Sequence, residues 1–152
     1  MFRGIQPVCL DAKGRVGIPS RYRERLTSVC ANALVLTLNP LDCCLWLYPL
    51  PEWEKIDEKL QELSDFDIQS RRTKQMMRGY ATDCELDGQG RILIPEALRA
   101  FADIEKHIMF IGQGNKFELW DESAWNKNRD DWLDKVGKGL GDPSEPLRRL
   151  SL

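Results

Sequence analysis

The chain contains LDAKGRVGIP at residues 10–19 and LDGQGRILIP at residues 86–95, two segments of similar sequence. Each copy is followed by an arginine, Arg23 or Arg99, so the shared pattern is L-D-x-x-G-R-x-x-I-P-x-x-x-R. The second copy lies 76 residues after the first, with seven identities over fourteen positions. Such a match at one constant offset indicates an internal duplication, which constrains the fold more strongly than any local pattern.

Each copy of the repeat begins with a tight turn. The side chain of Asp11 can accept hydrogen bonds from the backbone that follows it, as in an Asx-turn, and Gly14 can adopt the positive φ angle that a reversing chain needs. Asp87 and Gly90 occupy the same places in the second copy. We therefore interpret these two aspartates and two glycines as structural residues of the motif.

A short strand and a short helix are expected after each turn. Val16 and Ile18 alternate with Arg15, so the arginine lies on the face opposite the apolar residues, and residues 91–94 repeat this arrangement. A proline then ends each strand and suits the first turn of a helix. These helices carry Arg23 and Arg99, which we interpret as structural partners of the turn aspartates rather than as DNA ligands.

The duplication divides the chain into four segments. Residues 47–48 (LY) correspond to residues 119–120 (LW), so the similarity continues well past the motif. We assign the two repeats to residues 5–52 and 81–124, a helical connector to residues 53–80, and a C-terminal helix with its tail to residues 125–152.

Three helices are expected outside the motif. Pro51 opens an amphipathic segment that runs to Leu63, and Asp67 can cap a second helix that reaches Arg78 and stops at Gly79. Asp121 can cap a third helix that runs to about residue 136. The tail from residue 138 is rich in glycine and proline, and we expect it to be loosely held.

A single repeat is too small to bury a stable core, because it offers only four short strands and a little helix. The second copy supplies a partner on the same chain. We therefore expect a fold that is mainly β with α (α+β), in which the two units interleave to form one pseudo-two-fold antiparallel β-barrel with flanking helices.

Charge is distributed unevenly along the chain. The net charge is −2, which by itself argues against a nucleic-acid partner, but residues 1–25 hold six basic and two acidic residues. Residues 81–99 hold two basic and four acidic residues. Because DNA is bound through local basic surface, the first copy is the better candidate for contact with phosphates.

Several classes of site are excluded by composition. The five cysteines form no C-x-x-C pair and the single histidine has no partner at metal-ligand spacing, so we expect no metal, no cofactor and no disulfide. No apolar run approaches the length of a membrane span, and the N-terminus lacks the apolar segment of a secretory signal. We expect a cytoplasmic protein without a membrane or a small-molecule substrate as partner.

The repeated motif resembles the signature of SpoVT/AbrB-type swapped-hairpin DNA-binding domains, and two such copies in tandem resemble the MraZ family. The resemblance covers nearly the whole chain, from the start MFRG through LYPLPEW at residues 47–53 to FELW at residues 117–120. It implies two SpoVT/AbrB-like units and a nucleoid-associated repressor. It also implies a ring-shaped homo-oligomer, an octamer or dodecamer, on short repeats of double-stranded promoter DNA upstream of the bacterial division and cell-wall genes, its own promoter included.

The candidate DNA-binding residues are basic and lie mostly in the first copy. Each turn arginine can either contact phosphates and base edges or simply be solvated; its recurrence beside a glycine turn favours contact. Lys13 at the tip of the turn suits a phosphate, whereas the second copy has Gln89 there. The set is Arg15, Lys13, Arg91, Arg3 and Arg21.

Three classes of function could use such a chain. A sequence-specific regulator fits the repeated turn and the polarised charge. A non-catalytic oligomerisation or antitoxin-like partner-binding module would use the same fold with a disordered tail, and here the tail is short. An enzyme is disfavoured, because the carboxylate pair that Asp11 and Asp87 could form is explained by the turns, and no nucleophile, base or metal set is visible.

Overall fold

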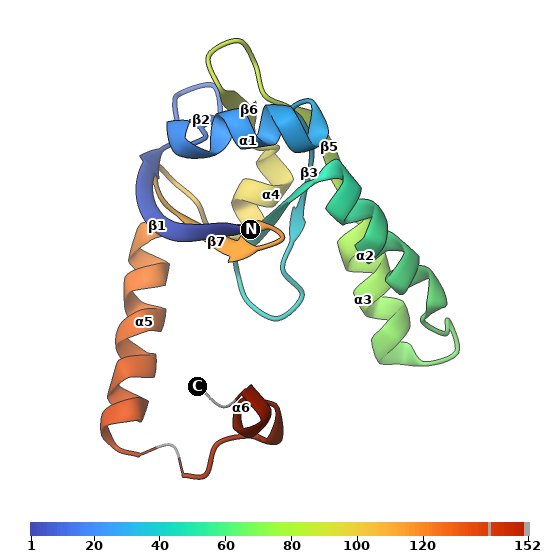
Figure 1. Ribbon diagram of the computed structural model, residues 1–152, viewed down its shortest axis with the longest axis vertical. Helices are drawn as coiled ribbons and strands as arrows, with labels where there is room; N and C mark the ends of the chain where they lie inside the picture. Colours follow the sequence, from blue (N-terminus) through green and yellow to red (C-terminus); the bar gives the residue numbers. More distant parts are fainter. Residues whose placement is uncertain (140, 151–152) are drawn as a thin grey trace. The chain divides into compact units, whose positions relative to one another are not determined.

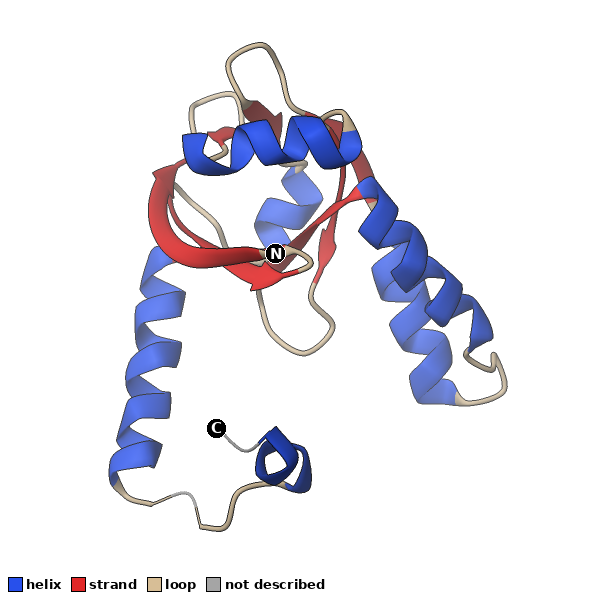
Figure 2. Cartoon of the chain, viewed as in Figure 1, coloured by secondary structure: helices blue, strands red, loops and turns tan. Residues whose placement is uncertain are grey.

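The computed structural model describes residues 1–139 and 141–150 and consists of two compact units, residues 1–122 and 123–152. The first unit contains the first repeat, the connector and the second repeat up to residue 122, and the second unit contains the C-terminal helices from residue 123 onward (Figures 1 and 2). The elements, in chain order, are β1 (Phe2–Cys9), β2 (Arg15–Gly17), α1 (Ser20–Cys30), β3 (Ala33–Leu38), β4 (Leu45–Pro49), α2 (Leu50–Glu62), α3 (Ile68–Gly79), β5 (Thr82–Glu85), β6 (Arg91–Leu93), α4 (Glu96–Phe101), β7 (His107–Gly114), β8 (Phe117–Asp121), α5 (Glu122–Gly137) and α6 (Glu145–Leu150).

The strands of the two repeats interleave. The larger sheet has the order β1-β7-β8-β4-β3-β5, and every ladder in it is antiparallel. The first strand of each repeat therefore pairs with the third strand of the other, β1 with β7 and β5 with β3, while β4 and β8 meet in the middle. This symmetric order confirms that the two repeats share one sheet.

The two motif strands pair with each other in a separate ribbon. β2 and β6 form a two-stranded antiparallel sheet in which Val16 lies opposite Ile92. Because these two residues are equivalent in the repeats, the pseudo-two-fold axis passes through their pair. The ribbon is continued by symmetric bonds, from the Ile18 N–H to the Gly90 carbonyl and from the Ile94 N–H to the Gly14 carbonyl, each 2.9 Å.

The expected fold class is confirmed in its general form, mixed α and β with mostly antiparallel sheet, but the strands of the described residues do not close into the expected barrel. The curved six-stranded sheet ends at β1 on one side and β5 on the other, and no ladder joins these edges within the described residues (Figure 2). β2 and β6 are not part of the six-stranded sheet, because these two motif strands pair with each other across the pseudo-two-fold axis.

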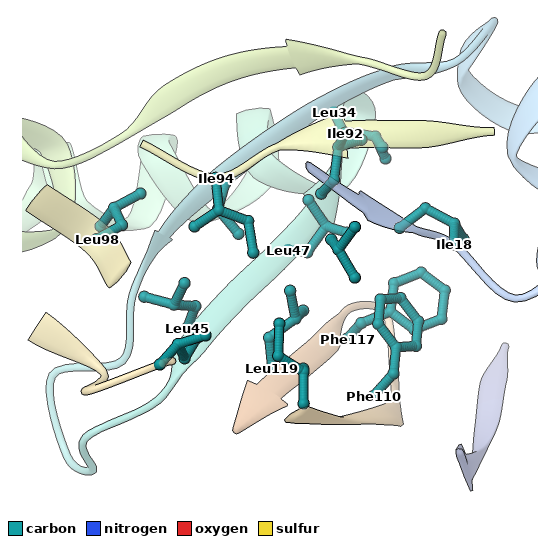
Figure 3. Packing of buried hydrophobic residues seen from close by; sticks show 14 of the residues in the cluster. Ile18, Leu34, Leu45, Leu47, Ile92, Ile94, Leu98, Phe110, Phe117 and Leu119 are labelled. Carbon is teal, nitrogen blue, oxygen red and sulfur yellow. The ribbon is translucent and has the colours of Figure 1, made fainter. Parts of the chain in front are cut away.

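Apolar residues from both repeats form one core. Figure 3 shows Ile18, Leu45 and Leu47 of the first repeat pointing into the same interior as Ile92, Phe110 and Phe117 of the second. All six are at most 1% exposed. The burial of side chains from both copies in one cluster explains why a single repeat is not expected to fold alone.

The connector helices lie side by side and match the sequence prediction closely (Figure 1). Asp67 caps α3 through its carboxylate, which accepts the Ser70 N–H at 3.0 Å. Arg78 Nε donates to Asp57 Oδ1 at 2.6 Å and ties α3 to α2. Gly79 is the last residue of α3 rather than the residue after it.

One helix differs from expectation, and the tail contains a further short helix. α1 has 11 residues and is longer than the short helix predicted, since its apolar residues Tyr22 and Leu26 pack into the core. The tail expected to be loosely held contains α6, which has an acidic first turn and a basic last turn, as the helix dipole favours. No helix in the described part of the chain is both long and apolar enough to cross a bilayer.

Candidate nucleic-acid interface

The two motif turns have nearly identical hydrogen bonds. In the first, Asp11 Oδ1 accepts the N–H groups of Lys13 and Arg15, both at 2.9 Å. In the second, Asp87 Oδ1 accepts the N–H groups of Gln89 and Arg91 at the same distance. The predicted Asx-turns are therefore present, and both projecting loops lie at the top of the view in Figure 1.

Each turn glycine has the positive φ angle that the sequence predicted. The φ angle is +81° at Gly14 and +73° at Gly90. The backbone N–H of each glycine donates to the carbonyl of the turn aspartate, at 3.1 Å for Gly14 and 3.0 Å for Gly90. The turns are thus closed by backbone and side-chain bonds together.

The turn aspartates pair with the arginines that follow the turns. Arg15 Nε donates to Asp11 Oδ2 at 2.8 Å, and Arg91 Nε donates to Asp87 Oδ2 at 2.9 Å. The expectation that Arg23 and Arg99 would pair with these carboxylates is wrong, because the closer arginine on the same turn takes that place. The Arg15 side chain stays 30% exposed and the Arg91 side chain 28%, so both guanidinium groups are held in position while part of each faces solvent.

These contacts stabilise the charged form of both carboxylates. The backbone N–H of Arg15, and to a lesser degree the guanidinium of Arg15 and the N–H of Lys13, hold the pKa of Asp11 below its usual value. The N–H groups of Arg91 and Gln89 and the Arg91 guanidinium lower the pKa of Asp87 in the same way. At neutral pH each turn therefore contains a fixed ion pair.

Arg23 and Arg99 reach across to the turn of the other repeat. Arg23 Nε donates to the Ile18 carbonyl at 2.8 Å, and its side chain covers the α-carbon of Gly90. The guanidinium of Arg99 lies against the α-carbon of Gly14 in the same manner. The glycine of each turn thus packs against an arginine of the other copy. The sequence alone did not indicate this relation.

The ribbon presents one apolar and one polar face. Val16 and Ile92 are at most 1% exposed, whereas Arg15, Leu93 and Arg91 lie on the opposite face. Leu93, directly opposite Arg15 in the ladder, is 55% exposed. Sequence reasoning did not single out Leu93, although the alternation in residues 91–94 already placed it on the same face as Arg91.

The remaining candidate residues fall into two places. Lys13 is exposed at the tip of the first turn, beside Arg15. Arg21 instead lies against Gly4 in the first half of β1 and stacks on the Tyr22 ring, 4.7 Å from its centroid. Arg3 is exposed on β1 next to Gly4. Arg3 and Arg21 therefore both lie near the start of β1 rather than in the turn.

The described residues contain no group of three or more histidine, cysteine, aspartate or glutamate side chains placed to hold a metal ion. The outer face of the ribbon instead presents the guanidinium groups of Arg15 and Arg91, held by their ion pairs, and the exposed side chain of Leu93. Chemically it can donate hydrogen bonds and attract anions.

Comparison with known proteins identifies the family. The family model described as "MraZ protein, putative antitoxin-like" matches residues 1–76 and 77–132. Proteins named "Transcriptional regulator MraZ" are 50% identical in Thioalkalivibrio sulfidiphilus and 49% identical in Pseudomonas aeruginosa, with 100% of each chain covered. A protein of the same name in Halorhodospira halophila is 47% identical, again over 100% of both chains. The chain therefore belongs to the MraZ family.

Proposed function

We propose that this chain is a transcriptional regulator that binds double-stranded DNA sequence-specifically through the β2–β6 ribbon and its two turns. The observation that carries the proposal is the symmetric placement of Arg15 and Arg91, each held by the aspartate of its own turn on the outer face of the ribbon. The names of the relatives support a role in transcription.

The ribbon has the chemistry expected of a major-groove reader. A two-stranded β-ribbon fits the major groove, and an arginine there can donate two hydrogen bonds to O6 and N7 of guanine. The ion pair with Asp11 uses Arg15 Nε, which leaves the two terminal nitrogens for a base edge. Lys13 at the loop tip supplies a phosphate contact that fixes the register of the ribbon.

The proposal extends to assembly and target. One chain offers a small basic surface on an acidic body, so tight binding requires several chains that act together on spaced repeats. The proposed assembly is a ring-shaped homo-oligomer, an octamer or dodecamer, in the cytoplasm and associated with the nucleoid. Its proposed targets are short repeats in its own promoter, from which it represses the division and cell-wall gene cluster.

An antitoxin-like module without DNA-reading activity is the second candidate, because the description of the matching family includes that term. Such a module would bind a protein partner through its helices and would not need a fixed arginine on each turn. The duplicated aspartate–arginine pair favours the DNA reader.

A mobility-shift titration with the DNA upstream of the gene that encodes this chain separates the two candidates. The regulator predicts saturable binding that exceeds binding to a shuffled sequence and weakens steeply with added salt, because phosphate contacts release counterions. Equal binding to both DNAs, or none at low salt, would contradict the proposed function.

A further inference from the structure

Leu93 lies opposite Arg15, the arginine proposed to contact DNA bases. In the ladder between β2 and β6 it is the partner of Arg15, so the two side chains lie on the same face of the ribbon. The bonds between Ile18 and Gly90 and between Ile94 and Gly14 place the Arg15–Leu93 pair at a non-hydrogen-bonded position. Side chains at such positions approach most closely, with α-carbons about 4.5 Å apart.

Nothing in the fold requires a leucine at this position. Leu93 is 55% exposed, while its neighbours Ile92 and Ile94 are buried in the core. Its equivalent in the first repeat is Gly17, opposite Arg91, so the same backbone forms without any side chain. Single exposed leucines are ordinary on protein surfaces, and the location of this one beside Arg15 is what makes it informative.

Among the base edges in the major groove, the C5-methyl group of thymine is the apolar partner available to Leu93. Guanine presents two acceptors that match an arginine, and thymine alone among the four bases presents a C5-methyl group. We propose that Leu93 packs on the C5-methyl group of a thymine adjacent to the base contacted by Arg15, and so helps to determine the sequence read. This inference rests on the proposed function.

Because of this pairing, the two halves of the ribbon present different side chains beside their arginines. Arg15 with Leu93 forms one reading pair, and Arg91 with Gly17 forms the other, which lacks an apolar side chain. Only the half of the site at Arg15 therefore discriminates thymine by its methyl group. A single chain reads an asymmetric sequence in spite of its pseudo-two-fold fold, which suits direct repeats better than a palindrome.

The test replaces each thymine of the bound DNA in turn by uracil, which lacks only the methyl group, and measures affinity for the full-length protein. Loss of one buried methyl contact should weaken binding about fourfold at the thymine beside Leu93. The Leu93→Ser variant should bind the unmodified DNA more weakly by a similar factor and be indifferent to uracil there. Leu93→Val, which retains an apolar side chain, should keep the sensitivity.

The matched control is Leu41→Ser, which removes a leucine that is 83% exposed in the β3–β4 loop and should bind like the wild type. The salt dependence of Leu93→Ser should equal that of the wild type, since no phosphate contact is lost. Size-exclusion elution should also be unchanged.

The inference would be overturned if the affinity of the wild type did not change with uracil at any thymine. It would also be overturned if the uracil effect persisted in Leu93→Ser, or if Leu93→Ser changed the oligomeric state. In these cases the wild type still binds promoter DNA, so the proposed function stands. Failure of the wild type to bind any promoter DNA would overturn the proposed function itself.

Discussion

Arg23 occupies the space that any side chain on Gly90 would need. A β-carbon added to Gly90 would overlap Arg23 Nε, the same nitrogen that donates to the Ile18 carbonyl. The reciprocal contact is looser, since a β-carbon on Gly14 would lie 3.2 Å from Arg99 Cζ. Arg99 Nε is buried and has no hydrogen-bond partner in the described structure. The two turns are thus supported unequally.

This inequality predicts different costs for the two glycine substitutions. Gly14→Ala places an alanine at a positive φ angle, which should cost about 1–2 kcal/mol of unfolding free energy. Gly90→Ala incurs the same strain and also displaces Arg23 from the Ile18 carbonyl, so it should cost about 1 kcal/mol more. Denaturant unfolding of both variants measures the difference.

Gly79→Ala is the control for these variants, since nothing lies within 4 Å of its added β-carbon at the end of α3. Its stability should be unchanged or raised, by about 0.5–1 kcal/mol at most. Equal losses at Gly14 and Gly90 would show that Arg23 does not hold the second turn.

The interleaved sheet predicts that the first repeat cannot fold alone as a monomer. A chain cut after Ser70 loses β7 and β5, the partners of β1 and β3, and half of the core. We expect this fragment to be unfolded, or to form a homodimer in which a second copy replaces the missing repeat. Sedimentation and amide spectra distinguish these outcomes from a well-folded monomer, which the shared core does not allow.

The turn carboxylates predict a specific pH dependence. The pKa values of Asp11 and Asp87 are lowered in the folded protein, so both groups stabilise it above the unfolded aspartate pKa of about 3.9. That contribution is lost as the pH falls through the lowered folded values. The free-energy difference between the wild type and Asp11→Asn should therefore be present at neutral pH and shrink in strong acid.

Asp11→Ala is the companion variant for this measurement. Asparagine keeps an oxygen for the N–H groups of Lys13 and Arg15, whereas alanine removes it. Asp11→Ala should thus stay destabilised in acid as well. A difference between the wild type and Asp11→Asn that is independent of pH would refute the role assigned to the charge.

The sequence was sufficient to predict elements governed by local chemistry. The Asx-turns, the positive φ angles at Gly14 and Gly90 and the Asp67 cap all depend on residues a few positions apart, and each was found. The partners of Arg23 and Arg99 were predicted wrongly, because pattern matching within one repeat does not show which groups of the other repeat lie nearby. The open sheet was missed for the same reason, since strand order is set by pairing between distant segments.

The charge difference between the repeats predicts unequal effects of the two turn arginines. Arg15 lies in the basic first copy beside Lys13, whereas Arg91 lies among acidic residues beside Gln89. Arg15→Ala should weaken promoter binding by about 1–3 kcal/mol per chain, and Arg91→Ala by less. Titration of both variants on one fragment at two salt concentrations tests this, with size-exclusion elution to confirm intact assembly. Binding by Arg15→Ala that equals the wild type would remove the first turn from the interface.

DNA reading by the paired turns is tested by a nuclease footprint on the DNA upstream of the gene encoding this chain, made with the wild type and with the double variant Arg15→Ala, Arg91→Ala. We expect regularly spaced protected segments with the wild type and none with the double variant at the same concentration, although the variant folds and assembles normally. An identical footprint from both proteins, or no protection by the wild type, would contradict the claim that the paired turns read DNA.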